Sequence, residues 1–421
     1  MIALINRLKY TWPLLSIFFL AFLLRLFLVH WAVGIGSVPK GEANPDQLDY
    51  EQFAFSLSRG EGYVLESGAP SARRAPGTSL SLLPIYWTFG RNLAVARVWN
   101  CFLSALCCIL VGWLGQIVVS RMAGWIAALW LAIYPGHAYY AVHFLSETPT
   151  CFFLCVGLLL QVDALRQKSV SWSVFSGISW GLAVLTRPNL LVSLLLNAVL
   201  PSFFGSGGMD RRFRLLHPLI FFVAASLVMA PWIVRNWMIF GKPTFATIVP
   251  GHTFWGSYNW QTAQSSETIG YWVPTSTLVD HDHRLPLSEP ENGEKAWEYG
   301  IRFIRENPGS IPLMKLHSFG RILFAYSESS NRLVDYAFRL SWLASLPFVL
   351  VGGFLLARRN WLEFLLISTP VVSLVVTTIL FYGCARFRDG IAPVFAIYFA
   401  VAMVECMKKI GYKPALTEST P

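Results

Sequence analysis

Long apolar runs are the sequence feature that most restricts how this chain can fold. A helix needs about 20 mostly apolar residues to cross the roughly 30 Å hydrocarbon core of a bilayer. Runs of about that length recur along the chain, and they predict ten membrane-spanning helices: 11–33, 93–119, 122–141, 148–166, 172–186, 188–203, 215–237, 334–356, 361–381 and 390–407. The predicted fold class is therefore an all-α polytopic membrane protein.

Composition excludes several other classes of protein. Of the 421 residues, 55% are hydrophobic and only 13% are charged, about half the roughly 25% typical of soluble domains. Disordered chains, soluble nucleic-acid-binding proteins and disulfide-stapled secreted modules are excluded on this basis. The seven cysteines lie in or beside apolar runs, and none has a metal-ligand spacing combined with His. We therefore expect the lipid bilayer as a partner, no nucleic acid, no cofactor and no metal.

Basic residues indicate which side of the membrane each loop occupies, because Lys and Arg concentrate in cytoplasmic loops. The run 172–203 is interrupted at Arg187-Pro188, where proline removes a backbone donor and disfavours helix at the preceding residue. Two crossings there place most basic loop residues on one side: Arg7, Lys9, Arg121, Arg166, Lys168, Arg211, Arg212, Arg214, Arg358, Arg359, Lys408, Lys409 and Lys413. This pattern predicts a multi-pass protein of the cytoplasmic (inner) membrane, with a retained first span and both termini cytoplasmic.

The spans divide the chain into three regions. They are an N-terminal membrane module with a first outer loop, a second large outer loop, and C-terminal membrane helices with a short cytoplasmic tail: 1–237 (loop 34–92), 238–333 and 334–421. The apolar segment 76–90 is too short to span, so we expect an outer-face or re-entrant helix. In the second loop, Trp297, Ile301 and Ile304 share one helical face, which predicts an amphipathic helix over 294–307 lying on the membrane.

Several arginines fall on the outer side under this topology. They are Arg73, Arg74, Arg187, Arg235, Arg386 and Arg388. Arg costs about 2.5–3.5 kcal/mol at the centre of a membrane helix and less near its ends. Each one alone is explained by snorkelling to lipid headgroups. As a set they predict an anion site, most simply for phosphate, because the guanidinium fork matches phosphate oxygens.

Acidic residues accompany these arginines. On a helix, Asp46 shares a face with Asp49 and with Tyr50; the alternative is that Asp46 only caps that helix. Glu147 follows Ser146 where one span hands over to the next, near His143. Two interpretations explain an acid at this position equally well. Glu147 is favoured in the first turn of a helix by the helix dipole, or it faces a catalytic cavity. A carboxylate beside a phosphate site suggests a base that activates an acceptor hydroxyl for attack on a sugar C1 that carries a lipid phosphate.

The order of the polar motifs resembles a known family over about residues 11–407. These motifs are Asp46…Asp49-Tyr50, Gly60-Glu61-Gly62-Tyr63, Ala72-Arg73-Arg74-Ala75-Pro76-Gly77, Ser146-Glu147, Thr186-Arg187-Pro188, Pro231-Trp232…Arg235-Asn236 and Arg386-Phe387-Arg388. The series is similar to that of bacterial GT-C glycosyltransferases that use polyprenyl-phosphate sugars. That superfamily includes protein O-mannosyltransferases and lipid A aminoarabinose transferases (glycosyltransferase family 39-like). The resemblance implies a GT-C helical bundle with juxtamembrane helices and loops on its outer face.

The resemblance also implies roles for individual residues. Asp46 matches the catalytic base best, with Asp49 as the alternative because Gln47 stands where many relatives have a second acid. Glu147 matches the second acidic position and would orient donor or acceptor. The residues expected to bind substrate are Tyr50, Arg73, Arg74, His143, Arg187, Arg235, His252, Arg386 and Arg388.

The predicted function is inverting, metal-independent transfer of a hexosyl or pentosyl group. The donor would be a polyprenyl-phosphate sugar, the acceptor a lipid, glycan or protein, and the active site would face the periplasm or exterior. Two alternatives stay open: a transporter or flippase of lipid-linked glycans, and an oligosaccharide ligase or polymerase. The transporter is less favoured because Arg25 is the only charge near mid-membrane and the two halves of the chain are dissimilar.

Overall fold

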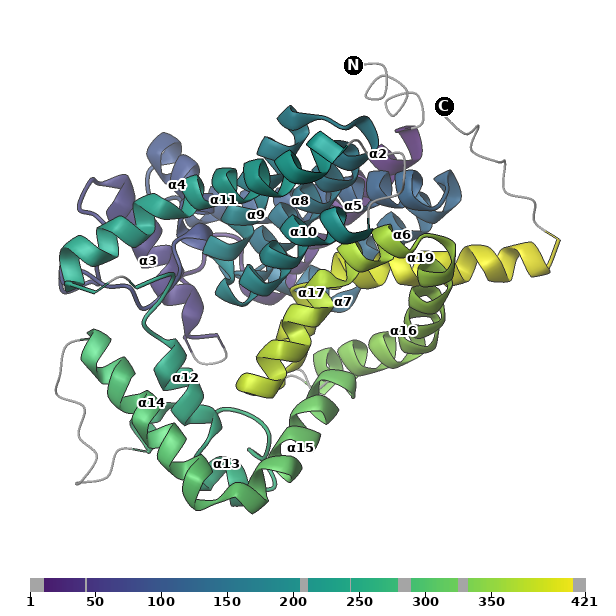
Figure 1. Cartoon of the computed structure of the whole chain (residues 1–421). Coiled ribbons are helices and arrows are strands. Elements are labelled where there is room, and N and C mark those ends of the chain that lie inside the picture. Colours follow the sequence, from purple (N-terminus) through teal and green to yellow (C-terminus); the bar gives the residue numbers. More distant parts are fainter. Residues whose placement is uncertain are drawn as a thin grey trace.

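The computed structural model describes residues 11–41, 44–204, 211–242, 244–278, 289–324 and 332–411. These residues form a helical bundle, shown in Figure 1, and the described part contains no β-structure beyond a single bridge between Val64 and Pro70. The long helices are α2 (Trp12–Leu28, continued by a π-helical turn Val29–Val33), α5 (Leu93–Val118), α6 (Arg121–Ile133), α8 (Glu147–Gln167), α9 (Val170–Thr186), α10 (Leu191–Phe204), α11 (Arg211–Phe240), α16 (Arg332–Arg359), α17 (Trp361–Leu380) and α19 (Ala392–Lys409).

Shorter helices lie in the segments that join the long ones. They are α3 (Asp46–Ser58), α4 (Gly77–Phe89), α7 (Pro135–Ala141), α12 (Pro250–Ser257), α13 (Trp260–Gln264), α14 (Glu289–Glu306), α15 (Ile311–Leu323) and α18 (Ala385–Asp389), with 3₁₀ turns at Pro188–Leu190, Thr275–Thr277 and Pro308–Ser310. In Figure 1, α12, α13 and α14 lie at the end of the molecule away from the start of α2 and the end of α19.

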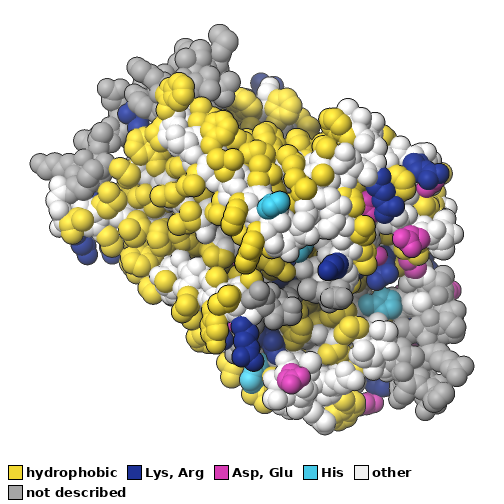
Figure 2. Space-filling model, turned by 180° about the vertical axis from the view of Figure 1, so that it is seen from behind, with side chains coloured by type: hydrophobic (Ala, Val, Ile, Leu, Met, Phe, Trp, Pro, Cys, Tyr) yellow, Lys and Arg dark blue, Asp and Glu magenta, His cyan; other side chains and the backbone are white. Residues whose placement is uncertain are grey.

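The fold class is that of an all-α polytopic membrane protein. Among the described residues, six helices are long and apolar enough to cross a bilayer: Trp12–Val33, Leu93–Val118, Glu147–Gln167, Arg212–Phe240, Arg332–Arg359 and Trp361–Leu380. Three shorter apolar helices occupy predicted spans, at Arg121–Ile133, Val170–Thr186 and Pro188–Phe204. Figure 2 shows a broad hydrophobic surface, with the acidic side chains gathered toward one end. A helix therefore lies at every predicted span, and six of the ten meet the length and hydropathy expected of one.

The predicted span 122–141 is wrong as a single helix. Helix α6 ends at Ile133, Tyr134 is extended (φ −65°, ψ 117°), and α7 begins at Pro135. Proline cannot continue a helix because it lacks the N–H and clashes with the preceding turn. The buried Arg25 of α2 donates to the carbonyls of Leu131 (3.3 Å) and Ala132 (2.9 Å), the last turn of α6. A cation at a helix C-terminus is stabilised by the helix dipole, so Arg25 caps this break.

The chain reverses at Arg187-Pro188, as the sequence predicts. The backbone of Arg187 is extended, a 3₁₀ turn follows, and α10 then runs back across the bundle. Near the end of α10, the Ser202 hydroxyl donates to the carbonyl of Arg214 at the start of α11 (2.9 Å). Helix α11 then runs parallel to α9. A Cβ at Gly181 would lie 2.8 Å from the Ala225 carbonyl oxygen, and a Cβ at Gly177 would overlap the Phe221 carbonyl oxygen. Helices α9 and α11 therefore end on the same side of the bundle.

The second loop folds into a small cluster of helices, of which 244–278 and 289–324 are described. The expected amphipathic helix is α14, but its apolar face is largely covered by protein. Trp297 packs on Phe254 of α12, with ring centroids 4.2 Å apart, and Ile304 lies against the same small core, while Ile301 is 39% exposed. Helix α12 thus supplies an apolar partner for Trp297 and a shared core for Ile304, and the placement of α14 on the membrane stays a prediction.

This helix cluster is attached to the end of α17. Lys315 donates to the carbonyls of Thr378 (3.3 Å) and Phe381, and the Tyr258 hydroxyl donates to that of Ile379 (3.1 Å). These carbonyls belong to the helix terminus, which has no intrahelical donors for them. The second loop therefore stabilises the C-terminal end of α17.

Candidate active site

The candidate site lies where the N-termini of α3, α8 and α18 meet the C-terminus of α9. Segment 71–76 crosses this region and leads into α4. A Cβ at Gly77 would lie 2.6 Å from the backbone nitrogen of Thr186, so only glycine lets α4 start against the end of α9. This close approach brings Arg74, just before α4, and Arg187, just after α9, to the same end of the bundle.

Asp46 and Glu147 are joined by one arginine. The Asp46 carboxylate pairs with Arg386 Nη1 at 2.9 Å through one oxygen and with Arg74 Nη2 at 2.7 Å through the other. Arg386 also pairs with Glu147 through Nε. Residues from α3, α8 and α18 therefore form a continuous ion-pair network, as the sequence analysis expects for Asp46, Glu147 and Arg386.

Arg187 completes the buried side of this network. Its Nη2 lies 3.1 Å from Glu147 Oε1, and its Nη1 donates to the Arg386 carbonyl at 3.4 Å. Glu147 is only 1% exposed. A Cβ at Gly390 would overlap Arg187 Nη1, so the guanidinium occupies space that only glycine leaves open. Glu147 is thus a fully desolvated carboxylate that two arginines compensate.

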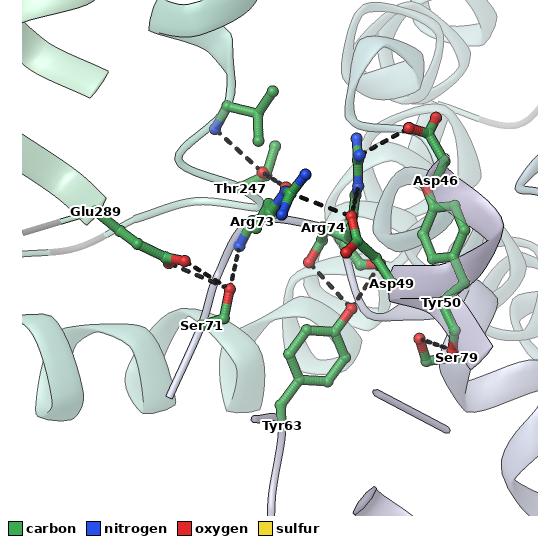
Figure 3. A network of polar contacts seen from close by, with 12 residues as sticks. Asp46, Asp49, Tyr50, Tyr63, Ser71, Arg73, Arg74, Ser79, Thr247 and Glu289 are labelled. Atoms are coloured by element: carbon green, nitrogen blue, oxygen red, sulfur yellow. Dashed lines mark hydrogen bonds and ion pairs between the residues drawn. The ribbon is translucent and has the colours of Figure 1, made fainter. Parts of the chain in front are cut away.

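Asp49 joins the network through Arg73 and Arg74 (Figure 3). Its carboxylate lies 2.8 Å from Arg74 Nε and 3.4 Å from Arg73 Nε, and the Arg73 side chain is 50% exposed. The connected network therefore holds three carboxylates and four guanidinium groups, from Asp46, Asp49, Glu147, Arg73, Arg74, Arg187 and Arg386. The excess of one positive charge favours binding of an anion.

The network sets the protonation of Asp46. Burial alone would raise the pKa of this carboxyl, but Arg386 and Arg74 outweigh burial and hold the pKa below its usual range. Tyr50, one turn further along the same helix, is buried. Burial and the charge of the Asp46 carboxylate raise the pKa of the Tyr50 phenol. Asp46 is therefore ionised at neutral pH, while Tyr50 is neutral.

His143 lies near the network but carries no charge there. Its ring packs on Tyr139 with centroids 4.7 Å apart. Burial and the charge of Arg97 lower the pKa of His143 to about 4. A substrate-binding role for His143 is thus restricted to the neutral imidazole at physiological pH.

Arg388 does not reach the site, so its predicted contact with substrate is wrong. The side chain is fully buried and pairs with Asp389 Oδ1 through Nη2 at 2.9 Å. Residues two apart on a helix point to different sides, which is why Arg386 and Arg388 of the short helix α18 diverge. The spacing of the two arginines in the sequence does not reveal which of them faces the site.

Arg235 and His252 lie beside the network rather than in it. Arg235 donates to the carbonyls of Ser71 (2.8 Å) and Tyr63 (2.9 Å) and stacks over Trp232. It therefore holds the segment that carries Arg73 and Arg74. His252 Nδ1 lies 3.1 Å from the Thr275 hydroxyl, and burial, followed by the charge of Arg73, lowers the pKa of its imidazole.

Residues of the second loop that sequence reasoning missed also contact this segment (Figure 3). Glu289 accepts from the Ser71 hydroxyl at 2.9 Å and from the Ala72 N–H at 3.1 Å. Thr247 donates to the Arg73 carbonyl at 2.7 Å. No local pattern marks Glu289 or Thr247, because their partners lie more than 170 positions away in the chain.

Within the described ranges, no group of three or more His, Cys, Asp or Glu side chains is placed to hold a metal ion. The three acids of the network are instead paired with arginines. The expectation that the reaction needs no metal stays a prediction.

Comparisons with known proteins agree with the helical architecture. Residues 76–235 match the family model described as dolichyl-phosphate-mannose-protein mannosyltransferase, a range that contains Glu147 and Arg187 and ends at Arg235. A crystal structure of the Archaeoglobus fulgidus oligosaccharyltransferase with Zn and sulfate has a TM-score of 0.56 at 17% identity, and covers 94% of this chain and 49% of its own. The fold is that of the GT-C membrane glycosyltransferases.

Other GT-C structures are also similar. The archaeal oligosaccharyltransferase AglB from A. fulgidus, in complex with an inhibitory peptide and a dolichol-phosphate, has a TM-score of 0.52 at 16% identity, with 97% of this chain and 53% of that chain covered. ArnT from Cupriavidus metallidurans bound to undecaprenyl phosphate gives a TM-score of 0.43 at 13% identity, with 96% of this chain and 79% of that chain covered. The chain spans about half the length of the oligosaccharyltransferases it matches. No curated protein matches it.

Proposed function

We propose that this GT-C protein transfers a sugar from a polyprenyl-phosphate donor to an acceptor hydroxyl, with inversion at C1. The observation that carries the proposal is the ion-pair network, in which four arginines meet three carboxylates at one end of a membrane bundle. The family model matched over 76–235 supports it, since its description names a dolichyl-phosphate sugar donor. So does AglB, whose structure holds a dolichol-phosphate.

The reaction we propose is a single displacement. The acceptor oxygen attacks C1 of the sugar and loses its proton to Asp46. The bond between C1 and the phosphate oxygen breaks, and its electron pair leaves with the lipid phosphate. Arg386 and Arg187 stabilise the charge that develops on that phosphate, because guanidinium groups bind phosphate oxygens through charge-assisted hydrogen bonds.

Donor binding would also free the base. Asp46 lies between Arg74 and Arg386, which engage both of its carboxylate oxygens. A phosphate that takes Arg386 for itself removes one of those partners and makes the Asp46 carboxylate more basic. Asp46 would thus become an effective base only once the donor is in place.

Membrane orientation supports an extracytoplasmic site. Helix α8 carries Glu147 at its start and Arg166 at its far end, where Arg166 pairs with Glu363. Arg359, at the end of α16, donates to the Val119 carbonyl. By the positive-inside rule these basic residues would face the cytoplasm, which would place the network on the periplasmic or exterior side, with both termini cytoplasmic.

The direct test is to incubate the purified protein with candidate polyprenyl-phosphate sugars and acceptors, and to follow release of the lipid phosphate. We expect release from the wild type and release slowed by about 10²–10⁴-fold from Asp46→Asn. A flippase or transporter would move the intact donor, so binding without cleavage of any donor would refute the proposal.

A further inference from the structure

The second arginine of the sequence Arg386-Phe387-Arg388 belongs to a buried network that the proposed reaction does not use. Arg388 Nε and Nη2 both donate to Asp389 Oδ1, at 3.0 and 2.9 Å, and the Tyr134 hydroxyl donates to the same oxygen at 2.7 Å. All three side chains are buried. This Tyr134–Arg388–Asp389 network joins α18 to the break between α6 and α7.

Two further contacts hold Arg388. Its Nη1 donates to the Ile322 carbonyl of α15 at 2.9 Å, and its guanidinium lies 4.2 Å from the ring centroid of Trp342 in α16. A helix as short as α18, only five residues, is not stable by itself. Its position is therefore set by these tertiary contacts.

We propose that Tyr134, Arg388 and Asp389 are positioning residues that hold the Arg386 guanidinium between Asp46 and Glu147 and thereby set the affinity for the donor phosphate. This proposal rests on the proposed function for its ligand. Arg386 and Arg388 point to different sides of α18, so the anchoring of Arg388 fixes the direction of Arg386.

The cost of the network favours a positioning role over a purely stabilising one. A buried ion pair often stabilises a protein no more than apolar side chains of the same volume would. Asp389 Oδ2 has no hydrogen-bond partner among the described residues, and a Cβ at Gly136 would lie 2.7 Å from it. The chain thus keeps a desolvated carboxylate, against a glycine that makes room for it, at the end of the helix that carries Arg386.

The test compares two tyrosines that each lose one buried hydroxyl. Tyr134→Phe removes the hydroxyl that donates to Asp389 at 2.7 Å and accepts from Arg388 Nη2 at 3.3 Å, and Tyr398→Phe removes a bond of 2.6 Å to Ser368 between α19 and α17. Binding of undecaprenyl phosphate in detergent micelles is titrated for both variants, in the wild-type and the Arg386→Ala background. Hydrogen exchange of the α18 amides is followed by mass spectrometry in the same proteins.

We expect Tyr134→Phe to weaken binding about fivefold, the effect of one hydrogen bond, and to have no further effect in Arg386→Ala. It should also speed exchange in α18, whereas Tyr398→Phe should do neither. An equal loss of affinity in both backgrounds, or unchanged α18 exchange, would overturn the proposal. If the wild type does not bind undecaprenyl phosphate, the proposed function fails, and the exchange comparison still decides whether the network positions α18.

Discussion

Arg386 Nη1 lies 2.9 Å from Asp46 Oδ2, although 340 positions separate the two residues in the chain. The contact joins the first helix after the first span to the short helix before the last one. It also places the group proposed to bind phosphate directly on the group proposed to take the proton. Under the proposed function, occupancy of the phosphate site and basicity of Asp46 would therefore be coupled.

Replacing Asp46 by Asn should separate binding from turnover. Loss of a general base lowers the rate by about 10²–10⁴-fold. Affinity for undecaprenyl phosphate should instead rise several-fold, because the amide no longer competes with phosphate for Arg386. Turnover and an equilibrium titration on the same protein check both effects.

Asp49→Asn is the matched control for that variant, since Asp49 contacts Arg73 and Arg74 but not Arg386. It should keep most of the turnover and change lipid-phosphate affinity less. Full turnover in Asp46→Asn together with loss in Asp49→Asn would assign the base to Asp49.

The pH dependence of turnover should report the guanidinium groups around Asp46. The charges of Arg386 and Arg74 lower the pKa of Asp46 in the folded protein. The stability that these ion pairs contribute is therefore present above the pKa of Asp46 in the unfolded chain, and it is lost as pH falls through the pKa of Asp46 in the folded protein. Arg74→Gln removes one of these charges and raises that pKa. We expect the acidic limb of the kcat/KM profile to move to higher pH.

Arg73→Gln serves as the comparison, because the Arg73 side chain is half exposed and its guanidinium pairs with Asp49 rather than with Asp46. Its profile should stay at the wild-type position. A limb that moves equally in Arg73→Gln and Arg74→Gln would mean that general charge, rather than the contact with Asp46, controls the titration.

Gly390→Ala should displace Arg187. The added methyl group would overlap Arg187 Nη1, which then loses its geometry toward Glu147. We expect weaker binding of undecaprenyl phosphate, by about tenfold for the loss of one charge-assisted hydrogen bond. Gly353→Ala, where a Cβ would meet Tyr398 at an ordinary 3.4 Å, should bind like the wild type.

Glu289→Ala should loosen the segment that carries Arg73 and Arg74. The change removes the acceptors for the Ser71 hydroxyl and the Ala72 N–H. Faster hydrogen exchange over 71–74 and a higher KM for donor are expected, with folding retained. The exposed pair Lys242–Glu294 offers a control on the same helix, since Glu294→Ala should change neither quantity.

Apolar run length and proline position predicted most of the fold, because both act locally. They placed a helix at every expected span and the reversal at Arg187, whose extended backbone precedes Pro188. They failed at Tyr134, where hydropathy continues across a break that Pro135 and Arg25 create together. A capping arginine from another helix cannot be seen in a hydropathy pattern.

Those residues of the candidate site that the sequence marks as charges at the outer ends of spans could be predicted. They are Asp46, Glu147, Arg187 and Arg386. The two arginines of α18 could not be told apart, because the rotation of a five-residue helix depends on tertiary contacts. The contacts of Arg235 with the Ser71 and Tyr63 carbonyls were equally hidden. A guanidinium near a span end can hold a phosphate or a backbone oxygen, and the sequence is the same in either case.

The helices of the second loop touch the bundle at several places, among them the end of α17 through Lys315, the stretch before α4 through Glu289, and α18 through the Ile322 carbonyl. None of these three contacts uses Asp46, Glu147, Arg187 or Arg386 directly. A segment grafted between α11 and α16 would leave these four charges undisturbed only if it supplied acceptors for both the Ala72 amide and the Arg388 guanidinium. The second loop could then vary in sequence between related chains only where these acceptors are kept.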